Sequence, residues 1–391
     1  MAENVKEHKG TVTSVFKDYG FIAADDISDQ DVYFKPSWFR GSPPLKQGDP
    51  VSFTVVEYDN GLQAKDLRRQ GSLARDQQKL KPITDDLLQW SYLGYLPNTL
   101  NQLRALALSE RWEFQNTPED PDHPFPILHS YLRYTFERLV LEGKVRISAN
   151  EQFAAFNTGL VDSRYETIFA VFQRNEGASS PWQLAEFCIA GEGSEGRNLV
   201  RNFTPLPSPA HYFDSPTDLL YDARKGSPEL DWEHVVIERI DRFPPAFLED
   251  NCPAGFELRD VRGLSWQDRR QYRESLGQAI QDDKKTYRRI MNRVRDAVQL
   301  SIKRVSWNFK TAVPQYYPRV QQLQLLLPLC LVSDECVDLA LAVEITPAGG
   351  YLGHTTLPLD WAYRNARLVC RPDSDWLEPD AIQGEELFEE A

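Results

Sequence analysis

Two short runs near the start of the chain, 18–22 and 31–35, place aromatic residues at alternate positions of two predicted strands. Successive side chains on a strand point to opposite faces, so Tyr19 and Phe21 share one face. Tyr33 shares that face as well if the two strands pair in register. Such a face, when exposed, is a platform on which the bases of a single-stranded nucleic acid can stack. Aromatic residues in strands also commonly form a hydrophobic core, and alternation alone leaves both interpretations open.

The residues around these runs predict three further strands. Thr11–Phe16 precedes them, and Val51–Glu57 and Leu62–Leu67 follow, with turns at Lys46–Asp49 and Asp59–Gly61. Residues 9–69 are therefore expected to form an all-β module of five strands.

This stretch resembles a cold-shock domain, which is a five-stranded barrel of the OB type. The matching residues are Gly10-Thr11-Val12, Tyr19-Gly20-Phe21-Ile22, Asp31-Val32-Tyr33, Gln47-Gly48 and Gly61-Leu62-Gln63-Ala64. The resemblance implies that single-stranded RNA or DNA stacks on the three aromatic residues of the two runs. The residues of this region that we expect to contact nucleic acid are Lys17, Tyr19, Phe21, Tyr33, Lys35 and Trp38.

The stretch also departs from the cold-shock pattern. Ser14 stands where the family has an exposed tryptophan, Lys35 stands in place of a histidine, and Pro36 in place of the phenylalanine after it. The stacking platform is therefore expected to be smaller than in bacterial cold-shock proteins. Trp38 and Phe39 either replace part of the lost stacking surface or pack against the barrel.

Length, charge and cysteine usage bound the remaining possibilities. The 391 residues are enough for two or three domains, and the net charge of −14 argues against a broadly cationic RNA coat. The five cysteines are scattered without a CxxC pair, which predicts neither a zinc ribbon nor a disulfide framework. With no signal-like start and no apolar run of 18 residues, we expect a cytoplasmic protein without membrane partners.

The rest of the chain is expected to form one larger domain. Residues 70–81 predict a polar linker, and 82–372 an α+β domain with a mixed or antiparallel sheet and one long helix over Trp266–Asn308. The stretch 190–226 is rich in Gly, Pro and Ser, which is typical of long loops or a lid. The acidic tail, 373–391, is expected to be disordered.

This second region resembles an uncharacterised bacterial family, a domain of unknown function found joined to RNA-binding modules of cold-shock or LOTUS type. The resemblance is carried by Phe156–Leu160 and by Thr355–Leu368. The resemblance implies a function linked to RNA, but it does not indicate a particular reaction.

The predicted long helix carries eight basic residues between 284 and 304, with Asp296 as the only acid in that span. Such a helix can pair with phosphates independently of sequence, although most charge runs are solvated outer faces. Arg288 and Arg295 are seven residues apart and share a face, so we select them as candidate phosphate ligands.

A polar constellation near the C-terminal end suggests a possible reaction. If the second domain is an enzyme, His354 is the candidate general acid or base, Arg367 the phosphate ligand and Asn157 the group that orients the substrate, with Asp360 beside them. We expect His354, Arg367 and Asn157 to line a common cleft if the two groups of strands form one sheet. Asn157 equally fits an ordinary turn before Gly159.

No known metal or nucleotide motif accompanies these residues. The histidines at 129, 211 and 234 lack metal-ligand spacing, and no GxGxxG, Walker A or GxSxG motif occurs, so we predict no metal site and identify no cofactor. Two hypotheses remain. In one, the barrel presents single-stranded RNA to a domain that processes it; in the other, the protein is a non-enzymatic RNA-binding regulator or chaperone with a scaffold domain.

Overall fold

A computed structural model describes most of the chain. The chain divides into two units, Met1–Ile83 and Thr84–Ala391. The predicted linker, 70–81, lies outside the described residues, which are 7–17, 19–24, 27, 31–39, 45–58, 61–69, 84–115, 124–176, 178–261 and 264–383. Among them, no helix combines the length and the apolar character needed to cross a membrane.

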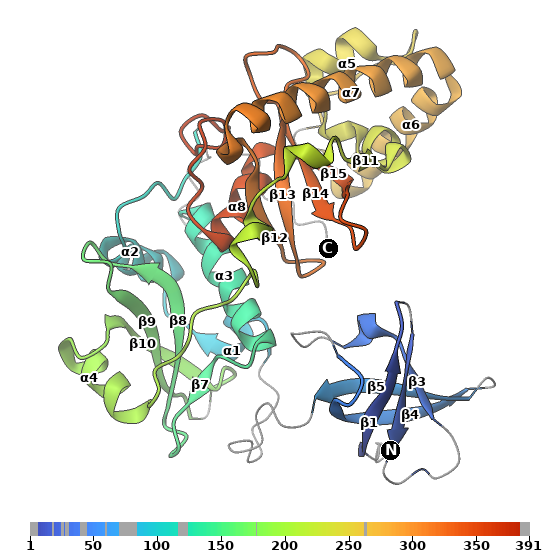
Figure 1. The fold of residues 1–391 in the computed structure, drawn as a ribbon. Coiled ribbons are helices and arrows are strands. Elements are labelled where there is room, and N and C mark those ends of the chain that lie inside the picture. The colour runs from blue at the N-terminus through green and yellow to red at the C-terminus, as the bar shows by residue number, and fades with distance from the viewer. Residues whose placement is uncertain are drawn as a thin grey trace. The chain divides into compact units, whose positions relative to one another are not determined.

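The first unit is a closed, OB-like barrel of five strands in the order β1-β2-β3-β5-β4, which confirms the predicted all-β fold (Figure 1). Its elements are β1 (Glu7–Val15), β2 (Gly20–Ala24), β3 (Val32–Phe34), the short 3-10 helix η1 (Pro36–Trp38), β4 (Pro50–Tyr58) and β5 (Gly61–Arg69). Strand β1 pairs with both β2 and β4, which closes the barrel. The interior is apolar, with Ile22, Val32, Phe34 and Phe53 almost completely buried.

The second unit is α+β, as predicted, and contains two five-stranded sheets. The first sheet has the order β6-β10-β9-β8-β7. Its strands and helices are α1 (Leu87–Trp90), β6 (Ser91–Tyr92), α2 (Leu96–Leu106), α3 (Pro126–Leu141), β7 (Arg146–Ile147), β8 (Phe153–Val161), β9 (Thr167–Arg174), β10 (Trp182–Ile189) and α4 (Gly193–Asn202).

The second sheet has the order β11-β15-β14-β13-β12. Its elements are β11 (Glu229–Leu230), α5 (Pro245–Asn251), α6 (Trp266–Asp282), α7 (Lys284–Trp307), β12 (Val313–Tyr317), β13 (Gln322–Leu329), β14 (Leu339–Ile345), β15 (Tyr351–Leu357) and α8 (Leu359–Val369). The short helical turns are η2 (Pro216–Leu219), η3 (Ala223–Lys225), η4 (His234–Glu238), η5 (Ile240–Arg242) and η6 (Phe309–Thr311).

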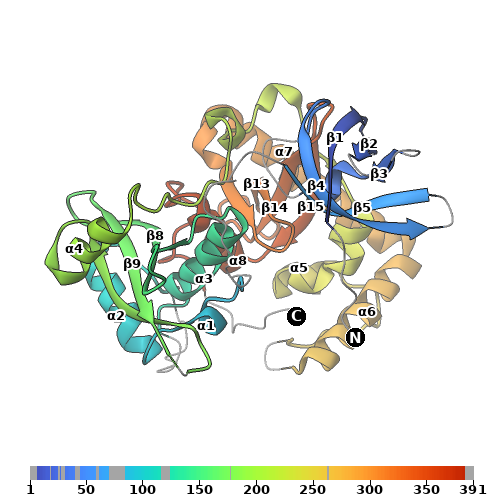
Figure 2. The same ribbon diagram turned by 90° about the horizontal axis from the view of Figure 1, so that it is seen from below.

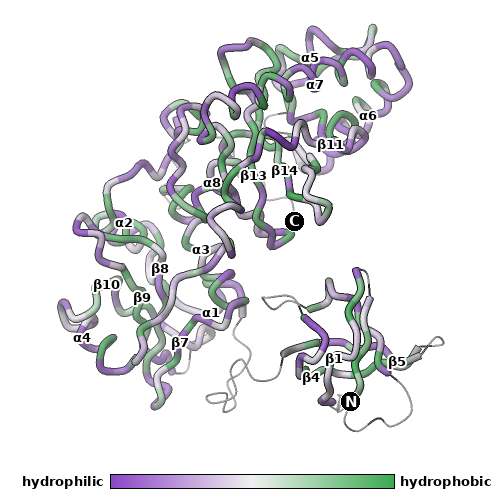
Figure 3. Tube along the Cα trace, in the orientation of Figure 1, coloured by the Kyte–Doolittle hydropathy of each residue, from purple (hydrophilic) through white to green (hydrophobic). Residues whose placement is uncertain are grey.

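Helix α7 covers one face of the second sheet because one stripe of the helix is apolar. Ile290, Val294 and Val298 are buried in the same cluster as Leu325 and Leu327 of β13. Figure 3 shows the hydrophobic residues concentrated along β13 and β14. Helix α8 packs against β12 and against α3, and in both ribbon views α3 and α8 lie side by side (Figures 1 and 2).

The single long helix expected over Trp266–Asn308 is in fact two helices. Asp283 interrupts it with non-helical backbone angles, φ −93° and ψ 88°, and its side chain accepts hydrogen bonds from the amides of Lys285 and Thr286. An aspartate in this position caps the start of a helix, because it satisfies amides that have no partner within the helix. The sequence-based expectation is therefore wrong at this break.

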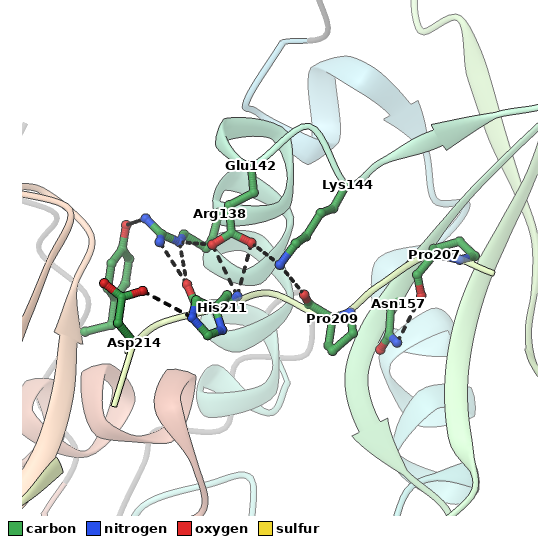
Figure 4. Close-up of polar contacts among 9 residues, drawn as sticks. Arg138, Glu142, Lys144, Asn157, Pro207, Pro209, His211 and Asp214 are labelled. Carbon is green, nitrogen blue, oxygen red and sulfur yellow. Dashed lines mark hydrogen bonds and ion pairs between the residues drawn. The ribbon is translucent and has the colours of Figure 1, made fainter. Parts of the chain in front are cut away.

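The loops expected over 190–226 begin with a helix, α4. A Cβ on Gly196 would lie 2.1 Å from the carbonyl oxygen of Ile189, so this glycine allows the helix to pack closely on β10. From Phe203 the chain continues as an extended connector that crosses α3, and Lys144 donates a hydrogen bond to the carbonyl of Pro209 (Figure 4).

The acidic tail is ordered over 373–383, which corrects the expected disorder for that part. Leu377 and Ile382 are buried, and the amide of Gln115 donates to the carbonyls of Pro379 and Ile382 at 3.2 and 2.9 Å. Two apolar side chains within an acidic segment are enough to anchor it, because each removes hydrophobic surface from water. Residues 384–391 lie outside the described part of the chain.

Candidate functional site

Five aromatic side chains form a continuous row on the outside of the barrel, and we call them the aromatic row. Successive ring centroids lie 4.7, 5.8, 6.1 and 6.0 Å apart in the order Phe16, Tyr19, Phe21, Tyr33 and Trp38. The first pair is stacked, and the other three pairs meet edge to face.

The pairing of β2 with β3 places the centre of this row. Phe21 lies opposite Tyr33 in the antiparallel register, which is the register that the alternation requires. The neighbouring positions Ile22, Val32 and Phe34 point inward and are fully buried. Each strand therefore contributes one face to the core and the other to the row.

Exposure decides between a core and a platform. Phe16 and Tyr19 are 52% and 40% exposed, whereas Phe34 and Phe53 are at most 1% exposed in the same barrel. Phe21, Tyr33 and Trp38 are half-buried. The row is thus a surface feature supported by a separate core.

Two lysines lie over the Trp38 end of the row. Lys35 Nζ is 5.8 Å and Lys65 Nζ 5.0 Å from the Trp38 ring centroid. Both are exposed, as is Lys17 near the other end. Trp38 packs partly against the barrel core, and its ring also contacts Tyr33 at the end of the row. The stacking of a base on Trp38 stays a prediction.

Sequence reasoning missed Phe16 and Lys65 as members of this surface. Phe16 directly follows β1, and an aromatic residue at a strand end beside Tyr19 was a usable signal. Lys65 lies two positions after Gln63, which pairs with Tyr33 across the parallel β3–β5 contact. That pairing joins segments far apart in the sequence, so no local pattern indicated it.

A second polar surface lies on the exposed side of α7. A shallow groove of about 560 Å³ is lined by Lys284, Lys285, Arg288, Arg289, Asn292, Arg293 and Asp296. Of the two arginines chosen from the sequence, Arg288 lines the groove. Arg295 lies beside it, where its guanidinium packs 5.2 Å from the ring centroid of Trp232 and donates to Asn292 Oδ1.

The four predicted catalytic residues each have different partners. His354 lies at a bulge in β15, between the residues that pair with Val343 and Ala342 of β14. Its Nε2 atom is 3.0 Å from Oε1 of Glu344. Bulges often redirect a side chain, and here the redirected imidazole meets a carboxylate of the adjacent strand.

Arg367 is buried and engaged with Glu110. Its Nε and Nη2 atoms donate to the two carboxylate oxygens at 2.8 and 2.6 Å, and its guanidinium lies 5.1 and 4.6 Å from the ring centroids of Trp112 and Tyr131. Burial lowers the pKa of this guanidinium, but the hydrogen bonds to Glu110 and the charges of Tyr131, Glu110 and Tyr363 together outweigh burial, so the pKa is raised. These contacts give Arg367 a structural role between α8 and the region before α3.

Asp360 is likewise buried and lies 3.0 Å from Nη2 of Arg364. Burial lowers the pKa of the Arg364 guanidinium, and the charge of Asp360 opposes this effect. The two residues lie in the first two turns of α8 and form an ion pair with each other inside the unit.

Asn157 lies within β8, where the pairing with β9 is irregular between Asn157 and Val161. Its side chain accepts from the amide of Gly159 at 2.9 Å. It also donates to the carbonyl of Pro207 at 3.3 Å (Figure 4). Gly159 has a φ of 74°, so the local turn that the sequence also allowed is present, as a bulge inside a strand.

The extended connector that begins at Phe203 is held against α3 by further polar contacts. Arg138 donates to the carbonyl of His211, and Glu142 accepts from the amide of His211 (Figure 4). Asn157 therefore helps to fix this connector to the first sheet.

The two groups of strands form separate sheets, so the condition for a shared cleft of His354, Arg367 and Asn157 is not met. Their catalytic roles remain predictions without a common site. Among the residues that the structure describes, no group of three or more His, Cys, Asp and Glu side chains could hold a metal ion.

These observations define a two-part protein: an OB-like barrel with an exposed aromatic row, and a larger α+β unit with a basic groove. The family described as "Domain of unknown function (DUF3825)" matches residues 103–376, and the chain belongs to this family. No curated protein matches the chain.

One solved structure to which the chain is similar is titled "drosophila Unr CSD456". The identity is 10% and the TM-score 0.17, over 49% of this chain and 65% of that one, so the chain covers just under two thirds of it.

Proposed function

We propose that this protein binds single-stranded nucleic acid, RNA in particular, on the aromatic row of its barrel. The observation that carries the proposal is the 52% and 40% exposure of Phe16 and Tyr19 in a continuous row of rings. Leaving aromatic surface in water sacrifices the stabilisation that its burial would provide. A bound base recovers that stabilisation, because every base has a π-face that stacks on an aromatic ring.

The charges around the row fit the same ligand. Lys17, Lys35 and Lys65 are exposed near its two ends, where they can pair with phosphates while the rings contact bases. The resemblance of residues 9–69 to cold-shock domains supports single strands over duplexes, since bases within a duplex are not available to stack.

For the second unit we propose a binding or scaffold role. Arg367, Asp360 and Asn157 are engaged in internal contacts, with Glu110, Arg364 and the Pro207 carbonyl respectively. Polar groups that make such internal contacts stabilise the fold. The geometry therefore favours a non-enzymatic RNA-binding regulator over an RNA-processing enzyme.

The test is fluorescence anisotropy of the full chain with labelled oligouridine of about 20 nucleotides, long enough to cover one OB-type site. Phe21→Ala should weaken binding by about 1–3 kcal/mol, which is the cost of losing one stacked base. The matched control is Tyr95→Ala, which removes a 59% exposed aromatic from the other unit and should leave affinity unchanged. Unchanged affinity of a folded Phe21→Ala protein would refute the proposal.

A further inference from the structure

The outer face of α7 carries an unusual charge for this chain. The helix holds eight basic residues and one acid, while the whole protein has a net charge of −14. Ile290, Val294 and Val298 bury the opposite side of the helix against the second sheet. Because the apolar stripe faces the sheet, the lysines and arginines of the first turns face solvent and are exposed.

The groove on this face concentrates positive charge. Its lining has five cations and one carboxylate, an excess of four, and Asp283 at the start of the helix reduces that excess to three. Arg289 and Arg293 donate to the carbonyl oxygens of Asn251 and Leu331, which are neutral partners. The two guanidinium groups therefore keep their charge and further donors for a ligand.

An exposed aromatic residue ends the same face. Trp307 is 93% exposed, and Phe309 just beyond it is 60% exposed. Trp307 follows Asp296 by 11 residues, which is close to three full helical turns, so both residues lie on one side of α7. From Lys285 to Trp307 the face extends for about 33 Å at 1.5 Å per residue.

We propose that this face of α7 is a second binding site for single-stranded nucleic acid. Phosphates of the strand occupy the groove over Lys285 and Arg288, and a base stacks on Trp307. A single strand supplies both phosphates and free bases, and the face offers both cations and an exposed ring. An acidic polypeptide would use the cations and leave the ring without a role. The site is separate from the aromatic row and does not depend on it.

The experiment uses the full chain carrying Phe21→Ala and Tyr33→Ala, so that binding through the barrel is weakened. Affinity for labelled oligouridine of about 20 nucleotides is measured from about 50 to 200 mM KCl. Adding Lys285→Glu and Arg288→Glu should reduce the slope of log affinity against log salt by roughly 1.4, since each lost phosphate contact contributes roughly 0.7.

The matched control is Arg197→Glu with Arg201→Glu, which makes the same charge change on exposed positions of α4. It should leave the slope unchanged. Equal slopes for the α7 variant and its parent would overturn the proposal while leaving the barrel site standing. The converse result, an unaffected Phe21→Ala protein with a weakened α7 variant, would remove the barrel function and keep the α7 site.

Trp307→Ala supplies the second measurement. It should weaken oligouridine binding between about 5-fold and 150-fold, the range for one stacked base, and should not change binding of an abasic strand of equal charge. A labelled polyglutamate peptide tests the other class of partner. If binding of the peptide requires Lys285 but binding of oligouridine does not, the face is a protein-docking surface and the proposal fails.

Discussion

Replacing Arg367 with Met tests whether this arginine holds the fold together or binds a phosphate. The change leaves the Glu110 carboxylate buried without its partner. Both side chains are less than a tenth exposed, at 9% and 8%, so solvent screens their interaction very little. Breaking a buried pair of this kind costs about 3–5 kcal/mol, mostly because an uncompensated charge remains.

The measurement is the free energy of unfolding from urea titration, followed by tryptophan fluorescence. The double variant Glu110→Leu with Arg367→Met removes both charges and should recover most of the loss, because well-packed apolar replacements of a buried pair are often close to neutral. The matched control is Arg270→Met, whose partner Glu274 is 62% exposed; it should cost at most about 1 kcal/mol.

The refuting result is also specific. If Arg367→Met unfolds with the stability of the parent but loses affinity for oligouridine, the arginine contacts the ligand and the structural interpretation is wrong. Under our interpretation, the affinity of the folded variant equals that of the parent.

Two further predictions concern features of the second unit that the sequence did not indicate. Asp283→Ala should destabilise the protein, because alanine cannot accept from the amides of Lys285 and Thr286 that Asp283 caps. Hydrogen bonds from Thr286 lower the pKa of Asp283. The stabilisation by the ionised carboxylate is therefore present above the ordinary pKa of aspartate and is lost as pH falls through the lowered value. In strong acid, the variant and the parent should have equal urea midpoints. Leu377→Ala should lower the free energy of unfolding by about 2–5 kcal/mol because Leu377 is 1% exposed. Leu88→Ala, at a 52% exposed position, should lower it far less. Equal losses of stability in the two variants would contradict the packing of the tail.

The α7 stripe and the aromatic alternation were both predictable from the sequence. The burial of Val294 and Val298 follows from their spacing of four residues, which places them on one side of a helix. The shared face of Phe21 and Tyr33 follows from the two-residue period of a strand, whereas the exposure of that face does not. Both patterns lie within a few neighbouring residues, so the chain itself contains the information.

The break at Asp283 shows where local patterning stops. The apolar stripe continues from Ile280 into α7, so periodicity alone predicts one helix. Only the cap geometry, with backbone amides of Lys285 and Thr286 bonded to the carboxylate, separates the two helices. Helix ends depend on such hydrogen bonds, and an aspartate within a polar run does not indicate which amides it will bind.

The candidate residues of the second unit were decided by tertiary structure. Arg367 meets Glu110 across 257 positions of sequence, and Asn157 meets the Pro207 carbonyl across 50. Whether His354 and Asn157 share a site depended on whether the strand groups form one sheet, and they form two. Periodicity specifies which side of an element is buried, but not which other element covers it. That choice depends on how all the apolar faces pack together, and it determines which polar groups are left free for a ligand.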